Sequence, residues 1–168
     1  MGENQAKPQG ARSHPGPRGA SGTQDVPDTA RFRDEKVNVR TALGGLWISM
    51  LFVFAYVDIF GFWRADVIRG ALAGEVPGVG FAIDQTFLTL TTIYIVIPSL
   101  MITVSLLAPV RATRVANIVV GLLYLVSVVV SIIGETWVYF VIGSIVELVL
   151  LAGIVKVAWS WPRRVDAS

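Results

Sequence analysis

The 168-residue chain contains no cysteine and a single histidine, His14. Without cysteine it can form neither disulfides nor thiolate metal sites, and iron–sulfur clusters and thiol–disulfide chemistry are excluded. His14 lies in a proline- and glycine-rich segment, so haem held by histidines and histidine-based metal or nucleophilic catalysis are not expected. A formal net charge of only +2 gives no indication of nucleic-acid binding. We therefore predict no cofactor, no metal site and no enzyme activity.

Apolar sequence, in contrast, is abundant. Hydrophobic residues make up 54% of the chain and its mean hydropathy is +0.64, which is too apolar for a soluble globular protein of this length. Four long apolar stretches occur, each long enough to cross a bilayer as a transmembrane helix; they cover about 41–62, 86–108, 115–133 and 137–159. We predict an all-α membrane protein in which residues 35–164 form a four-helix bundle in the lipid bilayer.

The segments outside these stretches differ in composition. Residues 1–34 are rich in glycine, proline, serine and charge, which predicts a disordered tail. After Trp63, apolar residues recur at helical spacing opposite three charged ones. This pattern predicts a short helix lying in the membrane interface, ended by glycine and proline from Gly74 onward. Asp84 is well placed to cap the second stretch.

Lysine and arginine predict the orientation. Basic residues precede the first stretch, occupy the turn at Arg111 and Arg114, and follow the last stretch, whereas the turn at Gly134 has none. The positive-inside rule then places both termini and the tail in the cytoplasm.

Glu147 is the only ionisable residue placed deep within a stretch. It lies about ten residues after Trp137, or about 15 Å into a hydrocarbon core about 30 Å thick. Gly143 and Ser144 share its helical face, and small residues let helices approach closely in lipid. We therefore expect Glu147 to face the bundle interior, while Lys156 projects to the opposite side and cannot readily pair with it.

Other polar groups are predicted at the same depth. Pro98 lacks an N–H, so the carbonyl of Tyr94 loses its helical partner and can accept a bond from elsewhere. Ser99 lies beside Pro98, and Tyr124 lies near mid-depth on the third stretch. These positions predict an intramembrane polar site formed by Glu147, Tyr124, Ser99 and Tyr94. With no cation at that depth, burial favours the neutral form of the Glu147 carboxyl.

Asp58 is a secondary candidate. It lies near the outer boundary of the first stretch, within reach of Arg64 or Arg69. We expect an interfacial salt bridge here rather than a ligand site.

The order of features resembles an uncharacterised family of small bacterial four-helix membrane proteins, defined only as a domain of unknown function. The resemblance depends on KVNVR before the first stretch, LWISMLFVFAYVDIFGFWR within it, ALAGEVPG in the connection, IPSLMI in the second stretch, RVANIVVGLLY in the third, VEL in the fourth and the Trp-Pro-Arg end. It covers roughly residues 35–164. It implies the architecture alone, because the family brings no activity, ligand or catalytic residue.

Two functions are consistent with these features, and the sequence favours the first. In the first, the protein has a structural or accessory role and its buried polar groups fix helix packing. In the second, it is a small proton-linked transporter or channel-like protein in which Glu147 takes up and releases a proton. A homo-oligomer is one option for either function, and the sequence does not identify a ligand.

Overall fold

A computed structural model of the chain describes residues 37–161, which form five helices and no strand. The predicted disordered tail at 1–34 lies outside the described residues. The helices are α1 (Val39–Gly61), α2 (Ala65–Ala73), α3 (Gln85–Leu107), α4 (Val110–Ile132) and α5 (Val138–Trp159). All except α2 are long and apolar enough to cross a membrane, as predicted from the four apolar stretches.

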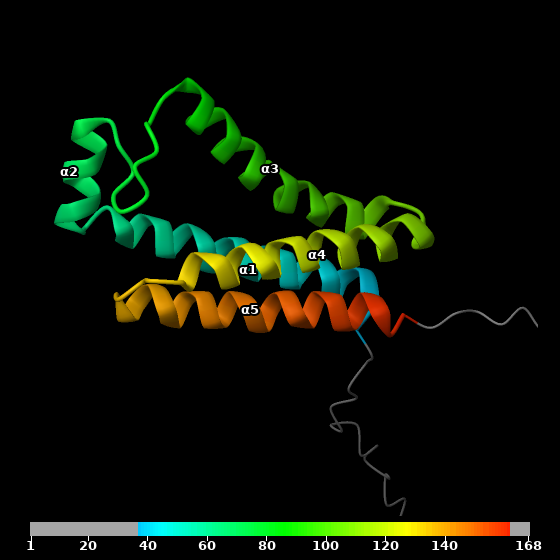
Figure 1. Cartoon of the computed structure of the whole chain (residues 1–168). Coiled ribbons are helices and arrows are strands. Elements are labelled where there is room, and N and C mark those ends of the chain that lie inside the picture. The colour runs from blue at the N-terminus through cyan, green and yellow to red at the C-terminus, as the bar shows by residue number, and fades with distance from the viewer. Residues whose placement is uncertain (1–36, 162–168) are drawn as a thin grey trace, which may run out of the picture. The chain divides into compact units, whose positions relative to one another are not determined.

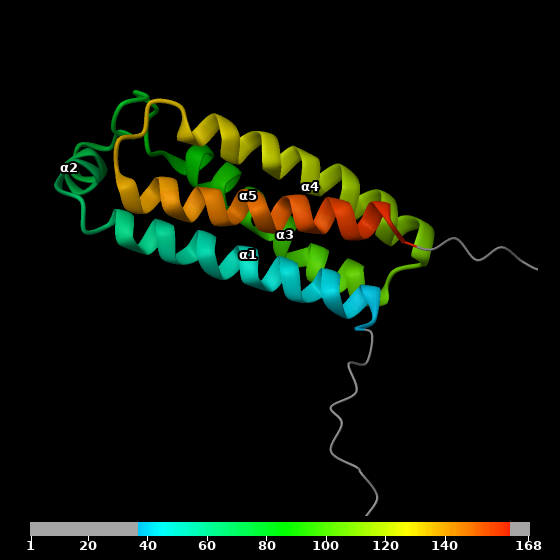
Figure 2. The same ribbon diagram turned by 90° about the horizontal axis from the view of Figure 1, so that it is seen from below.

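The four long helices form a closed ring of contacts. α1 packs on α3 and α5, and α4 packs on the same two helices. α1 and α4 run in one direction and α3 and α5 in the other, so α1 begins where α5 ends (Figures 1 and 2). We call this end of the bundle the terminal end, and the opposite end, where α2 lies, the α2 end.

Local sequence explains where the helices begin. The Asp84 carboxylate accepts a hydrogen bond from the Phe87 N–H at 2.8 Å, which confirms the predicted cap of α3. α4 begins at Val110, whereas the third stretch was predicted to start near 115. Pro109 stands at the N-cap of α4, and its restricted backbone lets the chain re-enter a helix at once. Arg111 therefore lies in the first turn of α4 and not in a loop.

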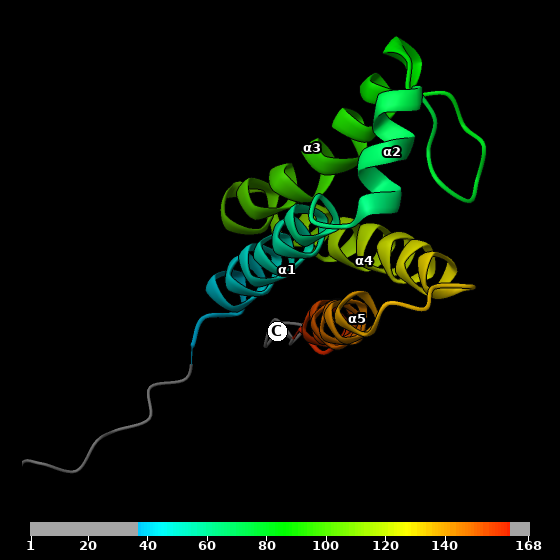
Figure 3. The ribbon, with the colours of Figure 1, turned by 90° about the vertical axis from the view of Figure 1, so that its left-hand side faces the viewer.

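The predicted short helix after Trp63 is present as α2. It ends at Gly74, whose φ of 75° is a left-handed conformation that glycine adopts without strain. Figure 3, viewed from the α2 end, shows α2 beyond the end of α1 and running across the direction of that helix. Trp63 and Leu72 are each 84% exposed, so this region presents large apolar side chains at its surface.

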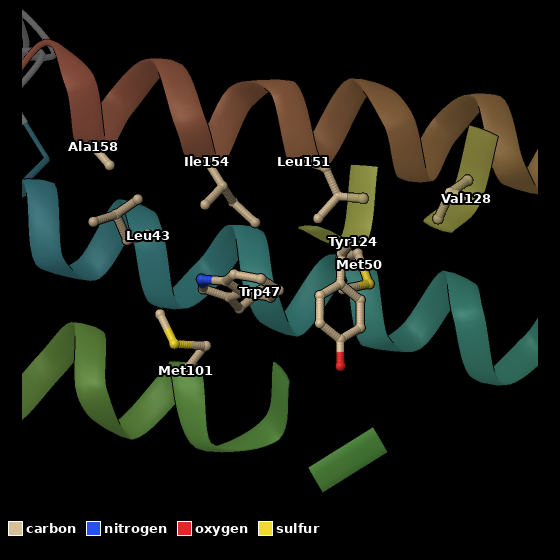
Figure 4. Packing of buried hydrophobic residues seen from close by; sticks show 9 residues of the cluster. All are labelled: Leu43, Trp47, Met50, Met101, Tyr124, Val128, Leu151, Ile154 and Ala158. Atoms are coloured by element: carbon tan, nitrogen blue, oxygen red, sulfur yellow. The ribbon is translucent and has the colours of Figure 1, made fainter. Parts of the chain in front are cut away.

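The half of the bundle near the terminal end is densely packed (Figure 4). Leu43, Trp47, Leu151 and Ile154 are fully buried there. Asn117 lies among them and is held by polar neighbours: its Oδ1 accepts from Trp47 Nε1 at 2.7 Å, and its Nδ2 donates to the Thr113 carbonyl at 2.8 Å. Ser105 bonds the same amide. Every polar group of this cluster thus has a partner within the protein, as burial requires.

The half near the α2 end is open because α3 leaves the bundle. Between Gln85 and Val96 only Phe87 and Tyr94 are not exposed, whereas Pro98, Met101 and Ser105 are buried. Figure 1 shows α3 diverging from α1 and α4 towards the α2 end. The change occurs at Pro98, inside the helix, where a proline removes a backbone hydrogen bond and favours a kink.

α1 and α5 remain in close contact where α3 departs. A Cβ added to Gly143 of α5 would collide with the side chain of Val57 on α1. Only glycine therefore allows this approach, in agreement with the use of small residues between membrane helices. The contact also sets the register of the two helices, because it places Val57 and Gly143 at the same level of the bundle.

Candidate functional site

The departure of α3 leaves a cavity of about 300 Å³ among the long helices. All four contribute to it: Phe54, Val57 and Asp58 from α1, Tyr94 from α3, Ser127, Val128 and Ser131 from α4, and Phe140, Ser144 and Glu147 from α5. Two carboxyl groups therefore line one cavity, and no lysine or arginine is among its lining residues.

Glu147 faces the interior, as predicted. The residue is only 3% exposed, and its Oε1 has no hydrogen-bond partner within the described part of the chain. Lys156 is exposed on the other side of α5. A buried carboxyl oxygen without a partner is costly in a native fold, because such groups are normally satisfied by protein or ordered water. This oxygen is therefore available to a proton, water or ligand in the cavity.

Two of the predicted partners of Glu147 are brought together with each other. The Tyr124 hydroxyl donates a hydrogen bond to the Tyr94 carbonyl, the group that Pro98 leaves without a helical partner. The Tyr94 hydroxyl in turn lies 2.7 Å from Ser127 Oγ. Tyr94 is thus held at both its backbone and its side chain, and it forms the α3 wall of the cavity.

The prediction that Ser99 joins this group is wrong. Ser99 is exposed on the outer side of α3, and its hydroxyl donates to the Ile95 carbonyl of the same helix at 2.9 Å. Thr92 does the same to Leu88 at 2.8 Å. Serine and threonine can satisfy their hydroxyls in this way on a lipid-facing surface, so Thr92 and Ser99 do not mark a buried face of α3.

The predicted salt bridge between Asp58 and Arg64 is also wrong. Arg64 pairs with Asp66 at 2.7 Å and with Glu135 at 3.2 Å. Arg69 is exposed, and no ion pair within residues 37–161 includes Asp58. Arg64 pairs with Asp66 and not with Asp58 because Asp66 lies only two residues away, at the start of α2. Its second partner, Glu135, comes from the turn between α4 and α5. Asp58 is left facing the cavity that Glu147 also lines.

The two acids lie on adjacent helices at different levels. Val57 and Gly143 meet, Asp58 is one residue beyond Val57 towards the α2 end, and Glu147 is four residues from Gly143 towards the terminal end. Five residues of helical rise separate the two levels by about 7.5 Å. Asp58 is therefore the outer acid of the cavity and Glu147 the inner one.

A second cavity, of about 780 Å³, lies at the α2 end. It shares Val57, Asp58 and Phe140 with the first cavity, so the two adjoin at the outer acid. Further linings come from α2, the connection after it and the turn between α4 and α5. The two cavities thus lie in the half of the bundle towards the α2 end, whereas the terminal half contains the packed Asn117 cluster.

The ion pairs beside the outer cavity are fixed in their charged forms. Arg64 lowers the pKa of Asp66 through a hydrogen bond. Partial burial alone would raise the pKa of Glu135, but bonds from the Trp137 and Thr136 N–H groups and from Arg64 hold that pKa below its usual value. The Arg64 guanidinium also lies 4.6 Å from the centre of the Trp137 ring. The Arg64 charge is thus paired with Asp66 and Glu135, and it does not neutralise the Asp58 carboxylate.

Sequence reasoning missed the grouping of Asp58 with Glu147. A signal was present, since Asp58 shares its helical face with Gly44 and Gly61, and Glu147 shares its face with Gly143. Small residues on both faces are typical of two helices that pack on each other. Together the two acids, three serines and one tyrosine can bind a positive charge or exchange a proton.

The fold defines a multi-pass, four-helix membrane protein. Residues 32–168 match the model of a family of unknown function, DUF6326, and the chain belongs to that family, which confirms the resemblance noted from its sequence. Neither a curated protein nor a solved structure matches the chain.

Proposed function

We propose that this protein is a small proton-linked transporter or channel-like protein, and not an enzyme, in which Glu147 takes up and releases a proton. The observation that carries the proposal is the buried Oε1 of Glu147, which lacks a partner within residues 37–161 and lines an acid-containing cavity. A carboxyl placed only to hold helices together would be expected to hydrogen-bond a neighbouring helix. Glutamate at mid-membrane also costs a few kcal/mol more than serine or threonine, which could serve the same packing role.

The proton would enter from the α2 end. The outer cavity adjoins the inner one at Asp58, so a proton arriving through water there meets Asp58 first and Glu147 next. Protonation neutralises Glu147 and removes the cost of a buried charge. Release to the terminal end requires the Asn117 cluster to open, so the structure corresponds to a state accessible from one side.

The proposed setting is the bacterial cytoplasmic membrane with both termini in the cytoplasm. Arg40, Arg111, Arg114 and Lys156 lie in or near the terminal end of the bundle, in keeping with the positive-inside rule. The exposed apolar residues Trp63 and Leu72 favour a location of α2 in the outer membrane interface. The surrounding partner is then the bilayer, and a homo-oligomer is compatible with this arrangement.

A structural or accessory role is the second candidate function, and the Asn117 cluster favours it. That cluster is buried, fully hydrogen-bonded and shared by α1, α3 and α4, as expected of groups that fix helix packing. It leaves the acids at the other end of the bundle unexplained, however, because neither is used in a helix contact of this kind.

Infrared titration of the purified protein in lipid tests the proposal. The carbonyl band of the protonated carboxyls disappears as the pH is raised, and we expect one component of this change to be missing in Glu147→Gln. Glu75→Gln is the matched control, because Glu75 is exposed in the connection after α2. A titration unchanged by Glu147→Gln would show that Glu147 does not exchange a proton, and the structural role would then be favoured.

A further inference from the structure

Building on the proposed function, we infer that the cavity between Asp58 and Glu147 binds a small monovalent organic cation with an apolar or aromatic body. The charge of this ligand lies beside the two carboxyls and its body lies against the aromatic wall. Its binding displaces the proton from Glu147, so that proton and cation alternate at one site.

The charge of the cavity is the first argument. Asp58 and Glu147 both line it, and its lining residues include no basic side chain. Arg64, the nearest candidate from the sequence, is bound to Asp66 and Glu135. The Glu147 Oε1 is buried and unpartnered within the described range, so it is a specific acceptor that a cationic ligand with N–H groups or a diffuse positive charge would satisfy.

The apolar wall is the second argument. Phe54, Tyr94 and Phe140 line the cavity together with two valines, and the rings of Phe54 and Tyr94 lie 6.0 Å apart at an angle of 45°. Aromatic faces attract organic cations through the ring quadrupole, and the attraction is stronger in a site without bulk water. A volume of about 300 Å³ is at the lower end of the range for small-molecule sites.

The geometry argues against an inorganic ion. Ca²⁺ takes six to eight oxygen ligands, whereas the cavity is lined by two carboxyls, whose residues lie about 7.5 Å apart in level along the helices. The described residues contain no group of three or more histidine, cysteine or acidic residues that could hold a metal ion. An organic cation can span these levels, with its charge near one acid and its body between them.

The outer cavity supplies a way in. It is larger than the inner one, about 780 Å³, and joins it where Val57, Asp58 and Phe140 line both. A cation entering from the α2 end therefore meets Asp58 before it reaches the aromatic wall and Glu147. Phe140 lies at the junction, so its ring contacts the ligand on entry and in the bound position.

Calorimetric binding of benzyltrimethylammonium to the purified full-length protein in lipid nanodiscs tests this inference. Neopentylbenzene is the neutral molecule of the same shape and serves as the ligand control. We expect benzyltrimethylammonium to bind and its neutral counterpart to bind at least about tenfold more weakly. Asp58→Asn and Glu147→Gln should each lower the affinity about tenfold or more, whereas Glu75→Gln should not change it. Repeating the titration in buffers of different ionisation enthalpy should show protons released on binding.

Equal binding of the two molecules, or an affinity unchanged by both Asp58→Asn and Glu147→Gln, overturns the inference. Displacement of the probe by millimolar Na⁺ alone also overturns it, since an inorganic ion would then be the ligand. Circular dichroism establishes whether each variant is folded. Because each acid is replaced in a separate protein, one variant still tests the inference if the other does not fold.

If the cation does not bind but the Glu147 infrared band still titrates, the inference fails and the proposed function stands. Binding without proton release in a protein whose band does not titrate contradicts the proposed function instead.

Discussion

We expect the replacement of Glu147 with glutamine to reduce proton entry into proteoliposomes to the rate of protein-free vesicles. Glutamine has nearly the shape of glutamate and keeps a carbonyl acceptor, but its amide does not take up and release a proton as a carboxyl does. Within residues 37–161, Glu147 is the only acid in the middle of a long apolar helix, and its Oε1 has no hydrogen-bond partner there. The expected loss is therefore complete and not partial.

A pH-sensitive dye inside the vesicles measures this flux after an imposed pH gradient. Glu75→Gln removes the same charge from an exposed position and should keep the flux of the unmodified protein. The midpoint temperature of thermal unfolding of Glu147→Gln should be equal to or higher than that of the unmodified protein, because a buried ionisable group is replaced by a neutral one. Proton flux retained by a folded Glu147→Gln protein would contradict the role of this residue.

We expect Asn117→Ala to lower the free energy of unfolding by about 2–3 kcal/mol. The Asn117 amide is bonded to Trp47 on α1 and to Ser105 on α3, and an interhelical bond in a membrane protein is worth about 0.6 kcal/mol on average. Alanine also leaves the Trp47 N–H buried without a partner, which adds a desolvation cost. The loss of unfolding free energy should therefore exceed that of a substitution at an exposed position.

Reversible unfolding in mixed micelles gives this free energy. Ser99→Ala is the matched control, since Ser99 is exposed and bonds only to the Ile95 carbonyl of its own helix; we expect a change below about 0.5 kcal/mol. An Asn117→Ala protein as stable as the Ser99→Ala protein would show that the cluster does not hold the bundle together.

Local chemistry made much of the fold predictable. The four apolar stretches predict the four long helices, Asp84 predicts the start of α3, and Gly74 predicts the end of α2. The free carbonyl of Tyr94 was also predictable, because a proline four residues later necessarily removes its helical partner. Its donor was not, since Tyr124 was expected to contact Glu147 and bonds to this carbonyl instead. The inward orientation of Glu147 follows from the small residues on its own face.

The relations between helices were harder to predict. Whether Asp58 meets Glu147 depends on the register of α1 against α5, which the contact of Val57 with Gly143 sets. The departure of α3 at Pro98 then decides that a cavity, and not a packed contact, lies between the acids. Ser99 misled because a hydroxyl that bonds within its own helix produces the same sequence pattern as one that faces a neighbour.

The central claim is that water reaches the acid-lined cavity from the α2 end and not from the terminal end. Because the chain has no cysteine, a single introduced thiol reports on its own position. Ser127 lines the cavity and is half-buried, whereas Ser105 is fully buried in the terminal half. With a charged, membrane-impermeant thiosulfonate added outside intact cells, we predict rapid labelling of Ser127→Cys and none of Ser105→Cys. Failure to label Ser127→Cys from outside, or labelling of Ser105→Cys at the same rate, would contradict it.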